Sequence, residues 1–490
     1  MKNLFNLSHY KNFTSDMGQL IPIMCHENLP GDIQQQTTEV LLRVSPLNTP
    51  VMHPVQVKIY HFYVPTRIVW DDFEDFITGG DDGNDASVYP QITLTPAEKS
   101  LADYLGLPIG NSLTVSAMPF RVYAKIWNEY FRDPDLETEL TIDTTSGADT
   151  TTNTTLQNCA WEKDFFTTCR ATEQKGADVS LPLGTEAEVK RRNATNNIPV
   201  FYESGTNTLT GVIAGGNFKV NPSSQLADST HTADAPIIFD PNNSLYADLS
   251  DATAATINQL KTAFAEQRFK EARLRYGNRF TEYLKWLGVS SPDSRLQRPE
   301  YLGGGKNTIS FSEIVQAGPD FDSNDGVGTL RGHGISALRS NRYKKFIHEH
   351  GYTMSFMSVK PRTMYTDGVP HMWSKTTKEE FFQKEYQHTG QRAVKNKEVY
   401  AAHTTPEGTF GYNDRYDEYR RMESSVAGEF RSTLDEWHMA RQFSSDPALN
   451  AAFVKANPTN RIYASTATNQ LQCMAYHSLQ ARRLLDINGR

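Results

Sequence analysis

Two alternating apolar runs among the first 65 residues constrain the fold more than any other part of the sequence. Val40, Leu42 and Val44 occupy every second position of the first run, which is the period of a half-buried β-strand. The second run starts with the same alternation at Val55, but both of its faces become apolar or aromatic over residues 60–64 (YHFYV). A strand of this kind begins with one solvated face and ends covered on both. The sequence therefore predicts layered β-sheets around a buried core.

Further strand patterns are spread over the whole chain. They fall at residues 307–315, 352–359 and 471–479, and the predicted helices span residues 119–132, 251–276 and 280–287. Within 352–359 the apolar phase slips, which predicts a bulge or a strand buried on both faces. Strands so distant in sequence must pair with one another, as in a Greek-key sandwich, whereas a doubly wound α/β sheet needs regular βα alternation. We expect a mainly β, antiparallel sandwich with large helical and loop insertions.

Residues 1–36 are polar and interrupted by proline and glycine. Phe5, Leu7, Tyr10 and Phe13 nevertheless need cover from water, so the segment is predicted to be an extended N-terminal arm that lies across a neighbouring molecule. A frayed terminus is the alternative interpretation.

Residues 185–255 differ in composition from the rest of the chain. They are rich in Thr, Asn, Ser and Gly, and they carry short β-prone bursts (IPVFY, LTGVI, NFKV) between turn residues. A structureless loop of this length inside a compact domain is uncommon. The segment is therefore predicted to be an inserted β-rich surface protrusion, and a merely tolerated surface loop is the alternative.

Charge, cysteine content and hydropathy exclude several classes of protein. The net charge of −8 argues against a surface that binds nucleic acid everywhere, so any contact with DNA must be local. The four cysteines form no C-x-x-C pair and no zinc-like spacing, which favours free thiols in a chain that folds in a reducing cytoplasm. No run approaches 18 apolar residues, so we expect no membrane insertion.

The sequence carries no recognised catalytic motif. It has no G-x-S-x-G, H-E-x-x-H or G-x-G-x-x-G. Residues 303–306 (GGGK) resemble part of a phosphate loop, but Asn307 replaces the required Ser or Thr, so a tight turn is the better interpretation. We expect no enzyme activity, no cofactor and no catalytic or metal-binding residues.

One basic cluster combines cations with aromatic residues. Arg339, Arg342, Lys344 and Lys345 are interleaved with aromatic positions 343 and 346, a combination suited to phosphate contact and base stacking. An ordinary solvated loop is the alternative. Two other basic clusters lie on the predicted helix at residues 268–275, where Glu partners favour a solvated or interface face, and at residues 482–490.

Several strings in the sequence are long and idiosyncratic. They include LLRVSPL, PVMHPVQVKIYHFYVP, WDDFEDFITGG, PFRVYAKIWNEYFRD, SPDSRLQRPEYLGGG and FGYNDRYDEYRR. These strings resemble the major capsid protein of the gokushoviruses, small icosahedral single-stranded-DNA phages of the Microviridae. The resemblance implies that residues 1–490 form a single eight-stranded antiparallel jelly roll of the viral capsid type. It also implies self-assembly into a T = 1 icosahedral shell around circular single-stranded DNA. Because a net-negative chain can bind DNA only where its basic groups are gathered, we predict that the basic cluster lies on the inner side of this shell and contacts the DNA weakly, without reading its sequence.

In these phages the capsid protein carries an insertion at the place of residues 185–255, which clusters at the three-fold axes. The resemblance thus implies a role in host attachment, with Phe201, Tyr202, Asn207 and Phe218 as receptor-facing residues. The implied partners are other copies of the chain, the single-stranded DNA genome, other virion proteins and a bacterial surface receptor. A carbohydrate-binding jelly-roll module and a glycoside hydrolase remain open as alternatives, the latter needing two carboxylates about 5–10 Å apart.

Overall fold

The computed structural model divides the chain into two compact units. The first combines residues 1–175 with residues 273–490, and the second spans residues 176–272. The residues that the structure describes are 2–81, 84–179, 188–191, 201–203, 209–210, 218–220, 226–228, 237–239, 245–248, 257–276, 280–288, 297–318 and 326–486. Most of their regular structure is β-strand in antiparallel sheets, which confirms the expected mainly β fold.

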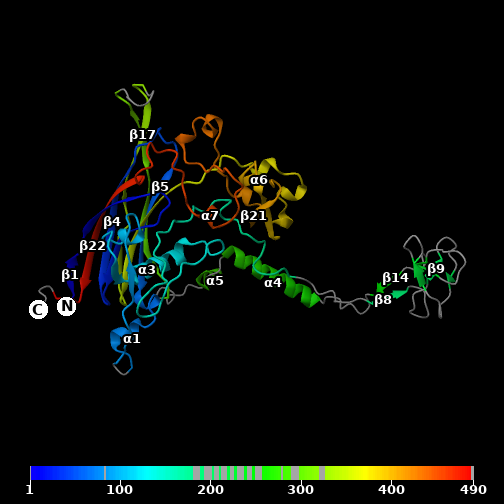
Figure 1. Ribbon diagram of the computed structural model, residues 1–490, viewed down its shortest axis with the longest axis horizontal. Coiled ribbons are helices and arrows are strands. Elements are labelled where there is room, and N and C mark those ends of the chain that lie inside the picture. Colours follow the sequence, from blue (N-terminus) through cyan, green and yellow to red (C-terminus); the bar gives the residue numbers. More distant parts are fainter. Residues whose placement is uncertain are drawn as a thin grey trace. The chain divides into compact units, whose positions relative to one another are not determined.

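Two antiparallel sheets form the body of the first unit (Figure 1). The four-stranded sheet has the order β15-β5-β19-β3, formed by β3 (Ile21–Asn28), β5 (Val55–Pro65), β15 (Glu300–Thr308) and β19 (Gly351–Pro361). The seven-stranded sheet has the order β1-β22-β4-β17-β16, while β2 also pairs with β22 and β18 with β4. Its strands are β1 (Asn3–Asn6), β2 (His9–Ser15), β4 (Ile33–Val44), β16 (Ser310–Val315), β17 (Leu330–Arg339), β18 (Tyr343–Phe346) and β22 (Leu471–Arg483). Apolar residues from both sheets pack into one core.

The alternation predicted from the first apolar run is confirmed in β4. Val40, Leu42 and Val44 are buried in the core, whereas Glu39 and Arg43 are exposed. The strand therefore has one face packed on the core and one face in solvent, as a half-buried antiparallel strand requires.

β19 and β15 flank β5 in the four-stranded sheet. β19 is buried on both faces, and its pairing with β3 shifts between Ser355 and Phe356, as the slipped apolar phase predicts. β15 corrects the interpretation of residues 303–306 as a tight turn, because these residues pair with β5. A Cβ on Gly304 would collide with the Ile59 carbonyl oxygen, so glycine permits the close approach of the two strands.

The structure corrects the expectation that residues 1–36 form an extended arm across a neighbouring molecule. β1 and β2 pair with β22, and β3 pairs with β19, so this segment contributes to both sheets of its own chain. Phe13 packs against the core, and Leu20 and Ile23 are fully buried. Much of the apolar surface that suggested cover from a neighbouring molecule is covered within the chain, because the strand partners of this segment lie hundreds of residues further along.

Helix α3 (Met118–Ile126) packs against the four-stranded sheet and confirms the predicted helix, which continues as a π-helical turn over Trp127–Phe131. The helix carries a fully buried ion pair, in which Arg121 Nε donates to Asp149 Oδ2 at 2.8 Å. The remaining Arg121 donors reach two backbone carbonyl oxygens, and Asp149 accepts from backbone N–H groups of its own loop. The pair therefore fixes the Thr-rich loop at residues 140–155 to the helix.

The other described elements of the first unit are short. They are α1 (Phe73–Thr78), β6 (Gln91–Leu94), α2 (Leu101–Tyr104), β7 (Leu113–Ser116), α5 (Phe280–Trp286), β20 (Gln391–Lys395), α6 (Asn396–Val399), β21 (Thr409–Asp414) and α7 (Ala451–Val454). A separate aromatic core packs around β20 and β21. Helix α4 (Ile257–Tyr276) and α5 confirm two predicted helices, although the expected start of α4 at residue 251 lies outside the described residues.

The second unit contains short strands within the segment predicted to be an insertion. They are β8 (Glu188–Arg191), β9 (Phe201–Glu203), β10 (Leu209–Thr210), β11 (Phe218–Val220), β12 (Leu226–Asp228), β13 (Ile237–Phe239) and β14 (Leu245–Asp248). β9 pairs with β10 and β13, β11 pairs with β12, and β8 pairs with β14. The β8–β14 pair brings the two ends of this segment together.

Part of the sandwich interior is polar. Tyr343 donates to Gln36 Oε1 at 2.6 Å, and Gln36 Nε2 donates to Thr38 Oγ1 at 3.2 Å. The Ile23 carbonyl oxygen can only accept, so His477 Nε2 carries the proton that reaches it at 3.1 Å, and His477 Nδ1 accepts from Thr38 Oγ1 at 2.9 Å. This directed chain of hydrogen bonds requires a neutral His477, and burial lowers the pKa of that imidazole to about 3.

Candidate nucleic-acid interface

The seven-stranded sheet has a solvent-exposed face, which we call the outer face. It consists of the residues that point away from the core on β1, β2, β22, β4, β18 and the part of β17 paired with β4. In β22, for example, Cys473 and Ala475 are buried, whereas Gln472 and Met474 on the other side are exposed. Strand pairing places the outward residues of the different strands in rows, so the register defines which of them are neighbours.

The outer face carries an excess of positive charge. Its basic side chains are Arg43, Arg339, Arg342, Lys344 and Arg482, all of them exposed. Among the described residues of this face, Glu39 is the one carboxylate, which leaves four positive charges in excess on a chain whose net charge is −8. A negatively charged protein that binds a polyanion must gather its cations locally, and the outer face is such a gathering.

The structure brings together three of the four predicted DNA-contact residues. Arg339 ends β17, Lys344 lies opposite Gln35 of β4, and Arg342 donates to the Gln35 side-chain oxygen in the amide orientation that satisfies both groups. Lys345 points to the other side of β18 and forms an ion pair with Glu300 at 2.7 Å. Both side chains of that pair are mostly buried, so Lys345 is separated from the other three cations.

The two aromatic residues next to this cluster lie on opposite faces of the sheet. Tyr343 is buried and hydrogen-bonded inside the sandwich, whereas the ring of Phe346 is 44% exposed on the outer face. The expectation that both aromatic positions are available for base stacking is therefore corrected, because alternate residues of a strand point to opposite faces. The Lys2 ammonium lies 4.7 Å from the centre of the Phe346 ring and covers it.

Arg339 forms a loose contact with the one carboxylate of the face. Its Nε lies 3.2 Å from Glu39 Oε1, and the two side chains are 72% and 50% exposed. Exposed ion pairs of this kind contribute only about 0–1 kcal/mol. The guanidinium can therefore exchange Glu39 for a phosphate at little cost.

Sequence reasoning did not assign four residues of the outer face to this site: Arg43, Arg482, Tyr10 and Tyr476. The polar positions of the alternating β4 and β22 runs give the first signal for them, since Arg43 and Tyr476 occupy outward positions. Their proximity could not be predicted, because it depends on β22 pairing with β4 and β2.

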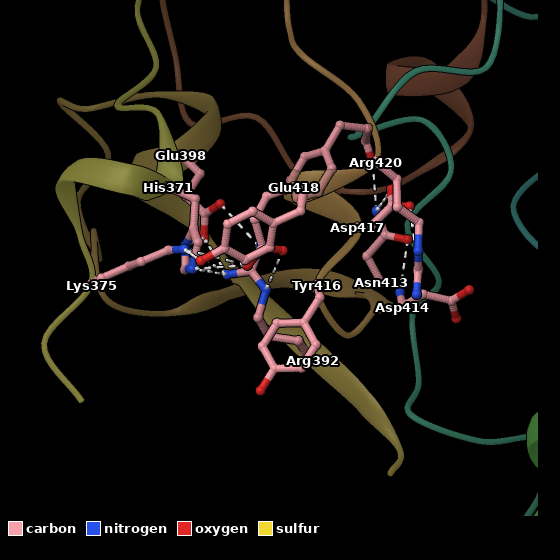
Figure 2. Close-up of polar contacts among 12 residues, drawn as sticks. His371, Lys375, Arg392, Glu398, Asn413, Asp414, Tyr416, Asp417, Glu418 and Arg420 are labelled. Atoms are coloured by element: carbon pink, nitrogen blue, oxygen red, sulfur yellow. Dashed lines mark hydrogen bonds and ion pairs between the residues drawn. The ribbon is translucent and has the colours of Figure 1, made fainter. Parts of the chain in front are cut away.

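A second polar cluster lies between the loops around β20 and β21 (Figure 2). Arg392 lies 3.3 Å from Glu398 and 3.8 Å from Glu418, and His371 Nδ1 lies 3.4 Å from the same Glu398 oxygen. Burial raises the pKa of Glu398, but the hydrogen bond from His371 and the charge of Arg392 outweigh it, so the pKa lies below its usual value. The cluster is a buried ion-pair network that holds loops together.

The described residues offer no group of three or more His, Cys, Asp or Glu side chains placed to hold a metal ion. The four cysteines are free thiols, as predicted. Of the proposed receptor-facing residues, Phe201 and Tyr202 belong to β9 and Phe218 belongs to β11, while Asn207 lies outside the described residues. Within the described part of the chain, none of the helices is both long and apolar enough to span a bilayer.

Comparison with known proteins matches the whole chain to one family. The family model described as "Capsid protein (F protein)" matches residues 1–489. Three relatives named "Capsid protein VP1" are similar over most of their length. The protein of Bdellovibrio phage phiMH2K is 35% identical over 472 residues, which cover 93% of this chain and 88% of the relative. Those of Chlamydia phage 1 and Spiroplasma virus 4 are each 30% identical, covering 99% and 93% of this chain and 94% and 89% of the relatives.

Proposed function

Because the chain belongs to the phage capsid protein (F protein) family, we propose that its copies assemble into a T = 1 icosahedral shell that encloses circular single-stranded DNA. Membership of the family makes the chain a structural capsid protein of the Microviridae and a component of the virion. It also implies a non-enzymatic role, in place of the glycoside hydrolase or carbohydrate-binding module that the sequence left open.

The proposed jelly roll is supported by the order of the strands. The two sheets contain the orders β2-β22-β4-β17 and β3-β19-β5-β15. Along the chain, β2, β3, β4 and β5 alternate between the sheets, and the later strands β15, β17, β19 and β22 alternate in the same way. Two interlocked Greek keys of four strands each produce this pattern in eight-stranded jelly rolls.

The charge of the outer face carries the proposal that the shell contacts its genome directly. Arg339, Arg342 and Lys344, extended by Arg43 and Arg482, supply cations at the surface of a rigid sheet. We propose that they contact phosphates without reading sequence, since no base-specific geometry is needed for that contact. The outer face then lines the inside of the shell, where the enclosed DNA lies.

The salt dependence of DNA binding tests this role. Replacing Arg339, Arg342 and Lys344 together by Gln should lower the slope of log K against log salt by about 2, because each phosphate contact to a single strand contributes about 0.7. Lys345→Gln is the matched control, since Lys345 is bound to Glu300, and its slope should match that of the wild type. An unchanged slope in the triple variant would remove the phosphate-binding role.

The location of the outer face can be checked on intact particles. A thiol introduced as Arg339→Cys should react with a membrane-impermeant maleimide in dissociated subunits and be protected in particles. Equal labelling in both states would place the face on the outside of the shell and contradict the proposal.

We also propose that residues 185–255 project from the shell and engage a receptor on the bacterial surface. The pairing of β8 with β14 supports an insertion whose two ends lie close together. The length of such an insertion adds little to the free-energy cost of folding the rest of the chain. Phe201, Tyr202, Asn207 and Phe218 are the proposed contact residues. Other virion proteins complete the set of proposed partners.

A further inference from the structure

Two tyrosines on the outer face form an aromatic pair that the phosphate contacts do not use. Tyr10 of β2 and Tyr476 of β22 lie directly opposite each other, with ring centres 4.6 Å apart and ring planes inclined by 32°. The Tyr10 side chain is 68% exposed. Exposed aromatic groups within a polar, positively charged surface indicate a ligand that has both a charged and an aromatic part.

We propose that Tyr10 and Tyr476 stack against unpaired bases, so that the outer face binds single-stranded DNA in preference to double-stranded DNA. This inference rests on the proposed function of the chain as a DNA-enclosing capsid protein. In a duplex the bases are stacked on one another and paired, whereas a single strand can turn a base face towards a protein ring. A face made only of cations would bind both single-stranded and double-stranded DNA through their phosphates. Exposed aromatic rings add binding energy only for single-stranded DNA, because only its bases are free to stack on them.

The register places cations around the aromatic pair. Tyr10, Tyr476, Glu39 and Arg339 form one row across four neighbouring strands, so Arg339 lies about 14 Å from Tyr10 at about 4.8 Å per strand. Arg43 lies four residues beyond Glu39 along β4, which corresponds to about 13 Å. The pair is thus bordered by cations on two sides, at separations that a few nucleotides of extended DNA can bridge.

A third cation completes the border in the opposite direction. Arg482 lies six residues beyond Tyr476 along β22, or about 20 Å, and its row also contains Phe346. The Phe346 ring already has the Lys2 ammonium above it. The tyrosine pair is therefore the better stacking platform of the two aromatic sites, and the phosphates on either side of a stacked base can reach different arginines.

The surroundings of the pair favour a nucleic acid over a second copy of the chain. The same face of another copy would bring two surfaces together that each carry four excess positive charges, and like charges at short distance repel. The neighbours of the tyrosines within the face are Asn12 and Ser478, polar groups that can hydrogen-bond to a base edge or a phosphate, and the exposed Met474, which lies opposite Asn12.

Binding to three probes of equal length separates stacking from charge. The full-length protein is titrated with labelled oligothymidine, with an oligonucleotide of the same length whose residues are abasic, and with a duplex. Wild-type protein should bind oligothymidine about 5- to 150-fold more tightly than the abasic strand, since stacking on one base is worth about 1–3 kcal/mol. The double variant Tyr10→Ser/Tyr476→Ser should bind both strands equally, while Tyr10→Phe/Tyr476→Phe retains the difference.

The controls distinguish failure of stacking from failure of the proposed function. The Arg339, Arg342 and Lys344 triple variant should weaken binding of all probes by a similar factor. If the Ser variant weakens the abasic strand as much as oligothymidine, or if wild-type protein binds both strands equally, stacking is refuted while the genome-contact role stands. If wild-type protein shows no salt-dependent binding to any probe, the proposed DNA contact itself fails. Wild-type circular dichroism spectra of the Ser and Phe variants establish that the fold is intact.

Discussion

Lowering the pH from 7 to 5 should destabilise the sandwich through two buried histidines. His61 lies between Ser355 and Ser340, with Nδ1 2.7 Å from one hydroxyl and Nε2 3.1 Å from the other, and His477 belongs to the directed chain that ends at a backbone carbonyl. Both imidazoles are fully buried. Burial lowers the pKa of His61 to about 4 and that of His477 to about 3, from an ordinary value of 6.5.

The sign and size of the effect follow from the difference between the two states. Below pH 6.5 both imidazoles become protonated in the unfolded chain, whereas in the folded chain they stay neutral until the pH approaches 4. Protonation therefore favours the unfolded state, and the folded state loses stability as the pH falls below 6.5. Each histidine lowers the free energy of unfolding by up to about 1.4 kcal/mol per pH unit, so the two together lower it by about 3 kcal/mol between pH 6.5 and pH 5. That is a large part of the roughly 5–15 kcal/mol that typically stabilises a domain.

Urea unfolding of dissociated subunits, followed by tryptophan fluorescence at pH 7, 6 and 5, measures this loss. The variant His61→Gln/His477→Gln will be less stable at pH 7, but its free energy of unfolding should depend on pH less steeply than that of the wild type. The difference between the two slopes should approach 3 kcal/mol per pH unit below pH 6. Carboxylates contribute equally to both proteins and cancel.

A surface histidine provides the matched control for this experiment. His388 is exposed, so His388→Gln should keep the wild-type pH dependence. If the free energy of unfolding of the double variant and of the wild type depends equally on pH, the reasoning is refuted. It is also refuted if His388→Gln reduces the pH dependence as much as the double variant does. Either result would show that the two buried imidazoles do not cause the acid sensitivity.

Three further outcomes are expected. Asp149→Asn leaves the buried Arg121 charge without its partner and should cost about 3–5 kcal/mol in thermal unfolding, whereas Asp446→Asn on the surface should change little. Gly304→Ala forces β15 away from β5 and should lower the melting temperature, while Gly318→Ala, with open space around it, should not. Excising residues 192–244 behind a Gly/Ser linker, which keeps β8 and β14, should yield particles that assemble but fail to adsorb; normal infection by such particles would rule out the receptor role.

Local patterns predicted several of the long strands. The alternation of Val40, Leu42 and Val44 identified β4 and its buried face, and the slipped phase near Phe356 identified the irregular strand β19, because side-chain period and burial are properties of neighbouring residues. In the N-terminal 36 residues, by contrast, the local pattern did not predict the strands. Their polar composition concealed three strands whose partners, β22 and β19, lie more than 300 residues away.

In the candidate site, too, the features set by local sequence could be predicted and those set by the pairing of distant strands could not. Three of the four predicted cations lie together, because Arg339, Arg342 and Lys344 are close in sequence and on one side of the sheet. Lys345 lies on the opposite face of the sheet, because the side to which a strand residue points depends on the strand register, which the basic composition of the cluster does not reveal. Tyr476 carried only the signal of an outward position, since its partner is Tyr10 at the other end of the chain.

The position of β22 has a consequence for how the protein is made. This strand lies between β2 and β4, so the seven-stranded sheet cannot close until residues 471–483 have left the ribosome. At about 5–20 residues per second, the roughly 430 residues after β4 take about 20–90 seconds to synthesise. During that interval β4 exposes an unpaired edge and the apolar side chains that β22 later covers. Nascent chains should therefore depend on chaperones or on slow elongation, and aggregation should increase steeply with expression rate and temperature.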